Sequence, residues 1–153
     1  MAGRKLGTKA EEEVVWMEHV LMQLNNLNKK VEEYSVAKKN ADSQLQPIVR
    51  QLQQIRQQGM IKNLGPLADS AGLLAVGAMR GSQMQRTRVL REGLASFKQL
   101  VDRTMKATID ADERDQERKH NELEAAKVVD KAAKAAKAAE QAATASAHPE
   151  APK

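Results

Sequence analysis

The sequence predicts an all-α protein: an elongated antiparallel helical hairpin or coiled coil, with a short helical turn region and an Ala- and Lys-rich C-terminal tail. Two observations support this prediction. Apolar residues recur every seven positions between Met17 and Ile55, which is typical of a coiled coil. β-branched and aromatic residues never alternate with period two, and the chain has only one Trp, one Tyr and one Phe, so no sheet is expected.

The first predicted helix covers residues 8–58 and follows a flexible N-terminal segment at 1–7. Thr8 and Glu11 have the spacing of a capping box, in which the two side chains bond the free N–H groups at a helix start. Gly59 is a suitable residue just beyond the end of this helix.

The sevenfold pattern within this helix forms one continuous seam, whose only weak positions are Lys38 and Ala41. Its members are Met17, Val20, Leu24, Leu27, Val31, Tyr34, Leu45, Ile48, Leu52 and Ile55. Lys38 is either a register device or a locally loose point. Pro47 removes one backbone hydrogen bond. Because the register is the same on both sides of Pro47, we favour a kink there over a second helix capped by Asp42 or Ser43.

Residues 59–82 are rich in glycine, and Gly65-Pro66 is a turn signal. The small and apolar stretch 67–79 predicts a short helix packed at the turn of the hairpin. Ser82 and Gln85 form a second capping-box pair, so a second long helix is expected at 83–122. The tail at 123–153 is Ala-rich, which favours partial helix without packing and disorder at the end.

A hairpin of this kind would leave half of the seam uncovered. With Gln58 beside Gln83, Ile109 lies opposite about Glu32, and the charged stretch 110–122 faces residues 19–31. Each apolar side chain left in water forfeits on the order of 1.5–3 kcal/mol. We therefore expect the N-terminal seam to bind partner helices or a second copy of the chain, through Val14, Trp16, Met17, Val20, Leu21, Leu24, Leu27 and Val31.

Positive charge is concentrated in the middle of the chain, since residues 50–106 carry ten basic and three acidic side chains. The basic patch consists of Arg80, Arg86, Arg88, Arg91, Lys98, Arg103 and Lys106. It is suited to the phosphates of nucleic acid or to anionic lipid headgroups; the alternatives are a solvated face, or ion pairs with acidic residues of a partner subunit. No aromatic side chains are interleaved to stack on bases.

Catalytic and cofactor-binding patterns are weak. The chain has no cysteine, and His19, His120 and His148 share no ligand spacing. Glu117 and His120 match half of a di-iron motif, but no second copy exists. We expect no enzymatic activity, no cofactor, no metal and no small-molecule substrate.

These observations predict a non-enzymatic structural or adaptor subunit of a multi-protein assembly. The alternative is an architectural protein that binds nucleic acid through the basic patch, and a further alternative is a peripheral membrane protein. We expect an intracellular, cytoplasmic location, because the first twenty residues contain no signal-peptide core and no stretch approaches a membrane span.

Overall fold

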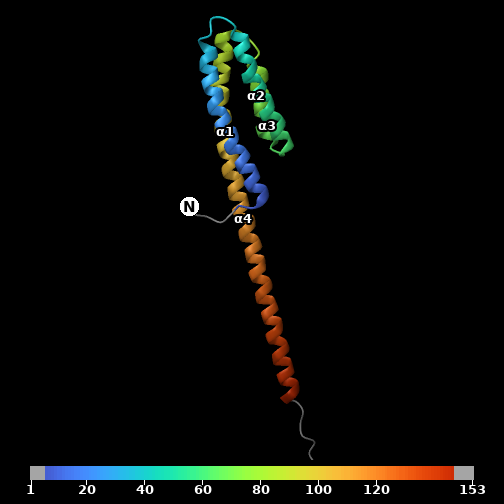
Figure 1. Ribbon diagram of the computed structural model, residues 1–153. Helices are drawn as coiled ribbons and strands as arrows, with labels where there is room; N and C mark the ends of the chain where they lie inside the picture. The colour runs from blue at the N-terminus through green and yellow to red at the C-terminus, as the bar shows by residue number, and fades with distance from the viewer. Residues whose placement is uncertain (1–5, 147–153) are drawn as a thin grey trace, which may run out of the picture. The chain divides into compact units, whose positions relative to one another are not determined.

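The computed structural model describes residues 6–146, and the described residues form four α-helices without a strand. The helices are α1 (Thr8–Ser35), α2 (Ala41–Ile61), α3 (Gly65–Gly77) and α4 (Gln83–Ser146) (Figure 1). The predicted all-α class is therefore confirmed. The expectations for residues 1–5 and 147–153, at the flexible N-terminus and the disordered end, lie outside the described residues.

The chain divides into two compact units after Ala111, and α4 contributes to both. In the first unit α1, α2, α3 and the beginning of α4 lie side by side and alternate in direction (Figure 1). Gln83, at the start of α4, donates hydrogen bonds to the backbone oxygens of Tyr34 and Ala37 at the end of α1. This contact sets α4 antiparallel to α1.

The heptad seam forms the core of this unit. The seam members from Met17 to Ile55 are all buried, together with Leu67 and Ala71 of α3 and Leu90, Leu94 and Val101 of α4. Burying a side chain of this size stabilises the fold by about 1.5–3 kcal/mol. Aliphatic side chains therefore supply most of the core that aromatic residues often provide.

The predicted single helix at 8–58 is wrong, because the chain turns at residues 36–40 and folds α2 back on α1. Asn40 precedes α2 in the left-handed conformation, with φ of 57°, which asparagine tolerates better than most residues. The helix break lies upstream of Pro47, which is exposed inside α2, so Pro47 does not separate the two helices. The two weak seam positions, Lys38 and Ala41, mark the turn.

The predicted pairing of the long helices is wrong for the same reason. Glu32 lies opposite Arg91 and forms a two-bond ion pair with it at 2.7 and 2.8 Å, rather than facing Ile109. Because α1 ends at Ser35, α4 runs back along α1 from that point, and its apolar residues reach the N-terminal half of the seam. The first unit therefore covers its own seam.

The helix starts show which local signals were reliable. Ser82 and Gln85 form the predicted capping box, with the Gln85 N–H donating to Ser82 Oγ at 3.2 Å and the Ser82 N–H donating to Gln85 Oε1 at 2.9 Å. The predicted box at Thr8 is absent, since Gly7 precedes α1 and no side chain caps it. The short helix expected within 59–82 is present as α3, with Pro66 in its first turn.

The second unit contains the remainder of α4, which is longer than the predicted 83–122. Its side chains from 117 to 140 are exposed, and no hydrophobic core residue comes from this stretch. Ion pairs one turn apart connect Asp115 with Lys119 and Asp130 with Lys134. Such pairs, with the high helix propensity of alanine, stabilise a helix without tertiary packing.

Candidate interaction surfaces

The eight residues predicted to bind a partner lie in or beside the core of the first unit. Val14, Trp16, Met17, Val20, Leu24, Leu27 and Val31 are buried, and Leu21 is half-buried. The Trp16 indole N–H donates to Gln58 Oε1 at 2.9 Å, which ties α1 to α2. The expectation that these side chains remain uncovered is therefore wrong, because α2 and α4 shield them within one chain.

The basic patch is divided by ion pairs within the chain. Arg91 pairs with Glu32, Arg88 pairs with Glu92, and Arg86 lies 3.4 Å from a carboxylate oxygen of Asp42. The guanidinium of Arg91, hydrogen-bonded to Glu32, lowers the pKa of that carboxyl and in turn has its own pKa raised. Exposed ion pairs contribute little to stability, but they reduce the positive field of the patch.

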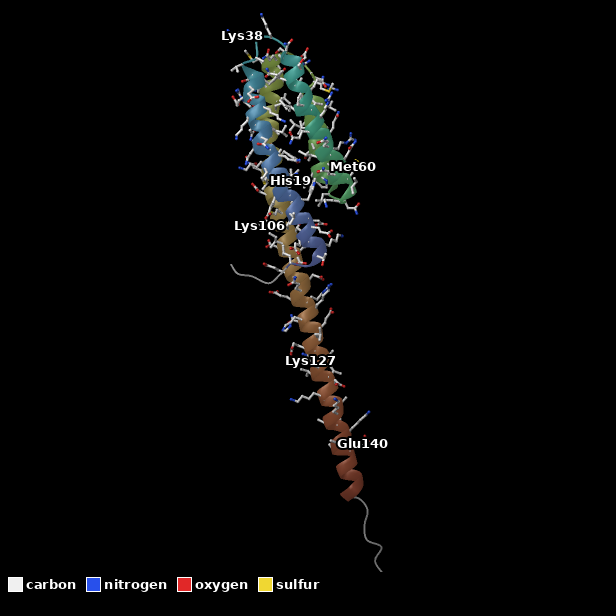
Figure 2. All side chains as sticks on the ribbon, in the orientation of Figure 1. His19, Lys38, Met60, Lys106, Lys127 and Glu140 are labelled. Carbon is white, nitrogen blue, oxygen red and sulfur yellow. The ribbon has the colours of Figure 1, made fainter. Side chains whose placement is uncertain are left out.

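Four members of the basic patch remain for an anionic ligand. Arg80, Lys98, Arg103 and Lys106 are exposed, and none of them makes an ion pair within the described part of the chain. Figure 2 shows Lys106 on α4, at a distance from the turn where Lys38 lies. The remaining cations are spread along the helix instead of converging on one point.

A surface that the sequence analysis missed lies on α3 and α4. On α3, Leu73 is 75 % exposed, Val76 51 % and, just beyond the helix, Met79 53 %. Residues three apart on a helix share a face, and Val89 of α4 is partly exposed as well. We call Leu73, Val76, Met79 and Val89 the α3/α4 surface.

A groove of about 430 Å³ adjoins the α3/α4 surface. Leu74, Phe97 and Leu100 contribute apolar walls, and Arg103 is the one charged residue in its lining. A side-chain carbon added at Gly93 would meet the end of the Leu74 side chain, so this glycine makes room for Leu74 to pack on α4. The sequence contains one indication of this surface. Leu73 and Leu74 are adjacent, so they lie on different sides of the helix, and when one side packs on the core the other apolar side stays exposed.

Within residues 6–146, neither His19 nor the acidic and histidine side chains that could bind a metal form a reactive arrangement. His19 lies on the exposed side of α1, with a ring nitrogen 3.3 Å from the amide nitrogen of Gln23 (Figure 2). Across residues 6–146, no three His, Asp or Glu side chains come close enough to hold a metal ion. None of the described helices has the length and apolar character needed to cross a membrane.

Comparison with known proteins adds no assignment: no family model matches the sequence, and no curated protein or solved structure matches it either.

Proposed function

We propose that this chain is a non-enzymatic helical adaptor subunit that binds an amphipathic helix of a partner protein on the α3/α4 surface. The observation that supports this is the exposure of Leu73 and Val76 on α3, and of Met79 just beyond it, while the other side of α3, at Leu67 and Ala71, is fully buried. Clustered apolar side chains rimmed by polar residues are typical of interaction sites, whereas single ones are ordinary.

The shape of the site favours a helical partner. Helix-in-groove binding uses apolar anchors spaced three or four residues apart. The groove between α3 and α4 offers Leu74, Phe97 and Leu100 as walls for such anchors. Ser96 lies along the same groove and is small and exposed, which leaves room for an anchor side chain of the partner.

Charge limits the partner further. The groove lining contains no carboxylate and includes Arg103, while Arg80 follows the end of α3. Complementary charge around an apolar site contributes mainly to specificity and association rate. We therefore expect an acidic residue beside the apolar anchors of the partner helix.

The test compares variants on matched exposed positions. The double change Leu73→Asp/Val76→Asp adds charge to the α3/α4 surface, and Met22→Asp adds charge to an apolar side chain on α1 that is 66 % exposed. Each variant is used to capture partners from native extract with quantitative mass spectrometry, and a recovered partner's helix is then titrated directly by fluorescence anisotropy.

We expect at least a tenfold loss of affinity for the α3/α4 variant, because two apolar contacts of about 1.5 kcal/mol or more each are replaced by desolvated charge. Met22→Asp should bind as the wild type does. Equal binding by all three proteins, with unchanged helix content by circular dichroism, would contradict the proposal.

Binding of nucleic acid is the alternative function, supported by the four cations of the basic patch that have no ion pair. Phosphate binding weakens steeply with salt, whereas apolar docking does not. A gel shift with random duplex at two salt concentrations therefore separates the two functions. Triple replacement of Lys98, Arg103 and Lys106 by Ala should abolish a shift that depends on phosphate contacts. Liposome flotation tests the membrane alternative.

A further inference from the structure

The turn at residues 36–40 separates two helices that share one heptad register. Val31 and Leu45 are separated by fourteen positions, or two heptads, as are Tyr34 and Ile48. All four side chains are buried. The register of the seam in α1 therefore continues into α2 although the helix itself does not.

A helical hairpin does not require this agreement. The turn reorients α2 freely, so the buried face of α2 can begin at any residue. A continuous helix across residues 36–40 has a stricter condition, because its apolar residues lie on one side only if they keep a spacing of 3.5 to 3.6 residues per turn. The shared register is therefore required if α1 and α2 form one continuous helix, but it is not required for the hairpin.

Three of the five residues of the turn, Ala37, Lys38 and Lys39, favour helix. Its sequence is Val36, Ala37, Lys38, Lys39 and Asn40, with neither glycine nor proline. Alanine and lysine are good helix formers, and glycine, proline or asparagine usually marks a tight turn. Asn40 alone has a positive φ, and Val36 is 75 % exposed, so the turn has little of its own that resists becoming helical.

We propose that two copies of this chain exchange α1. In the exchanged dimer the turn is helical, α1 and α2 form one long helix, and each α1 packs on α2, α3 and α4 of the other copy. The side-chain contacts of α1 with the rest of the first unit are then remade between chains, including Trp16 with Gln58 and Glu32 with Arg91; the hydrogen bonds from Gln83 to the backbone oxygens of Tyr34 and Ala37 are the exception. Exchange of an identical element is a low-cost route to a dimer.

The pairs across α1 and α2 locate the centre of such a dimer. Trp16 bonds Gln58, and the midpoint of that pair is position 37; Lys30 bonds Gln51 at 3.5 Å, with a midpoint between 40 and 41. The twofold axis would therefore pass close to Lys38. Lys38 lies at the turn (Figure 2). Two lysines of like charge would meet at the axis, which disfavours the dimer relative to the hairpin.

Gln83 is the contact that holds the turn closed. Its side-chain amide donates to the backbone oxygens of Tyr34 at 2.7 Å and Ala37 at 2.9 Å. In a continuous helix these oxygens would accept from the backbone N–H groups four residues later instead. The α3/α4 surface is outside this exchange, so the inference stands apart from the proposed function.

The test shifts the balance in both directions. Lys38→Leu/Asn40→Ala restores the weak seam position and removes the left-handed residue, whereas Asn40→Gly keeps the positive φ at no steric cost. Masses are measured by light scattering over a wide range of concentrations. The first variant should be a dimer and the second a monomer, and the dimer should have a slightly higher helix content because residues 36–40 become helical.

A chemical link then distinguishes exchange from simple association. Because the chain has no cysteine, Lys30→Cys/Gln51→Cys can be joined specifically by a short bis-maleimide. The hairpin should give a link within one chain, and the exchanged dimer a link between two chains. A dimer whose links stay within one chain would show surface association and overturn the proposal.

Gln83→Ala provides an independent route if the double variant fails to fold. Loss of its two hydrogen bonds should raise the dimer association constant at least about tenfold. Gln99→Ala, at an exposed glutamine farther along α4, is the matched control and should leave it unchanged. Absence of interchain links in both the Gln83→Ala variant and the Lys38→Leu/Asn40→Ala variant overturns the proposal.

Discussion

Replacement of Leu27 by Ala tests whether the N-terminal seam is a core of the single chain. Leu27 is fully buried in α1, and such Leu→Ala changes cost about 2.7–5.0 kcal/mol through lost burial and the cavity left behind. We expect a loss of about 3–4 kcal/mol in the free energy of unfolding. Met22→Ala, on the exposed side of the same helix, should change it by no more than about 0.5 kcal/mol.

The assay is urea unfolding of the wild-type chain and of each variant. Trp16 is the only tryptophan and is buried against α2, so its fluorescence reports on the packing of α1. With a slope of about 2 kcal/mol/M, the midpoint should fall by roughly 1.5–2 M for Leu27→Ala.

Protein concentration decides between the two interpretations of the seam. If the seam is covered within one chain, the midpoint is the same over about a hundredfold range of concentration. If another chain covers it, the midpoint rises with concentration because folding is linked to association. A rising midpoint, or a cost below about 1 kcal/mol for Leu27→Ala, would refute the burial argument.

Three further predictions concern single contacts. Glu32→Gln should remove a pH-dependent part of the free energy of unfolding. Because Arg91 lowers the pKa of Glu32, the ion pair stabilises the fold above the ordinary carboxyl pKa, and this contribution is lost as the pH falls through the lowered pKa. Unfolding midpoints measured between about pH 5 and pH 3 should show the difference. Trp16→Phe should cost about 0.5–1.5 kcal/mol by urea unfolding followed by circular dichroism, because it removes the hydrogen bond to Gln58; an unchanged midpoint would show that solvent replaces the bond. Pro47→Ala should raise the unfolding free energy by about 2 kcal/mol, since it restores a backbone donor inside α2, and a lower thermal midpoint would contradict this.

Features that depend on neighbouring residues were predictable. The all-α class follows from the spacing of apolar residues, and α3 follows from Gly65-Pro66 and the apolar residues after it. The capping box at Ser82 is formed by residues within one turn of each other. In each case the residues that determine the structure lie close together in the sequence.

The break in the first helix was not predictable in this way. Ala37 and Lys38 favour helix, and the heptad register runs through them. What holds the turn is Gln83, which lies 46 and 49 positions away from its partners Ala37 and Tyr34. Once the break was missed, the pairing of Glu32 was assigned to the wrong part of α4, and the seam was expected to need a partner.

The α3/α4 surface depends on distant residues as well. Leu73 and Leu74 have the same chemistry in the sequence, yet the first is exposed and the second buried. The difference is the position of α4, where Gly93 makes room for the Leu74 side chain. Which side of α3 remains open is therefore set by a helix that begins six residues after α3 ends.

The heptad seam alone could not distinguish a core from an interface, because both bury the same residues against the same helices. In the hairpin Leu27 packs within its own chain, and in an exchanged dimer it would meet equivalent side chains of a second copy. The apolar energy of the seam therefore cancels between the two forms. The balance depends on the few residues that differ in environment, namely Lys38 at the twofold axis, Asn40 with its positive φ, and Gln83 on the carbonyls of α1. Changes at these positions should therefore alter assembly far more than stability.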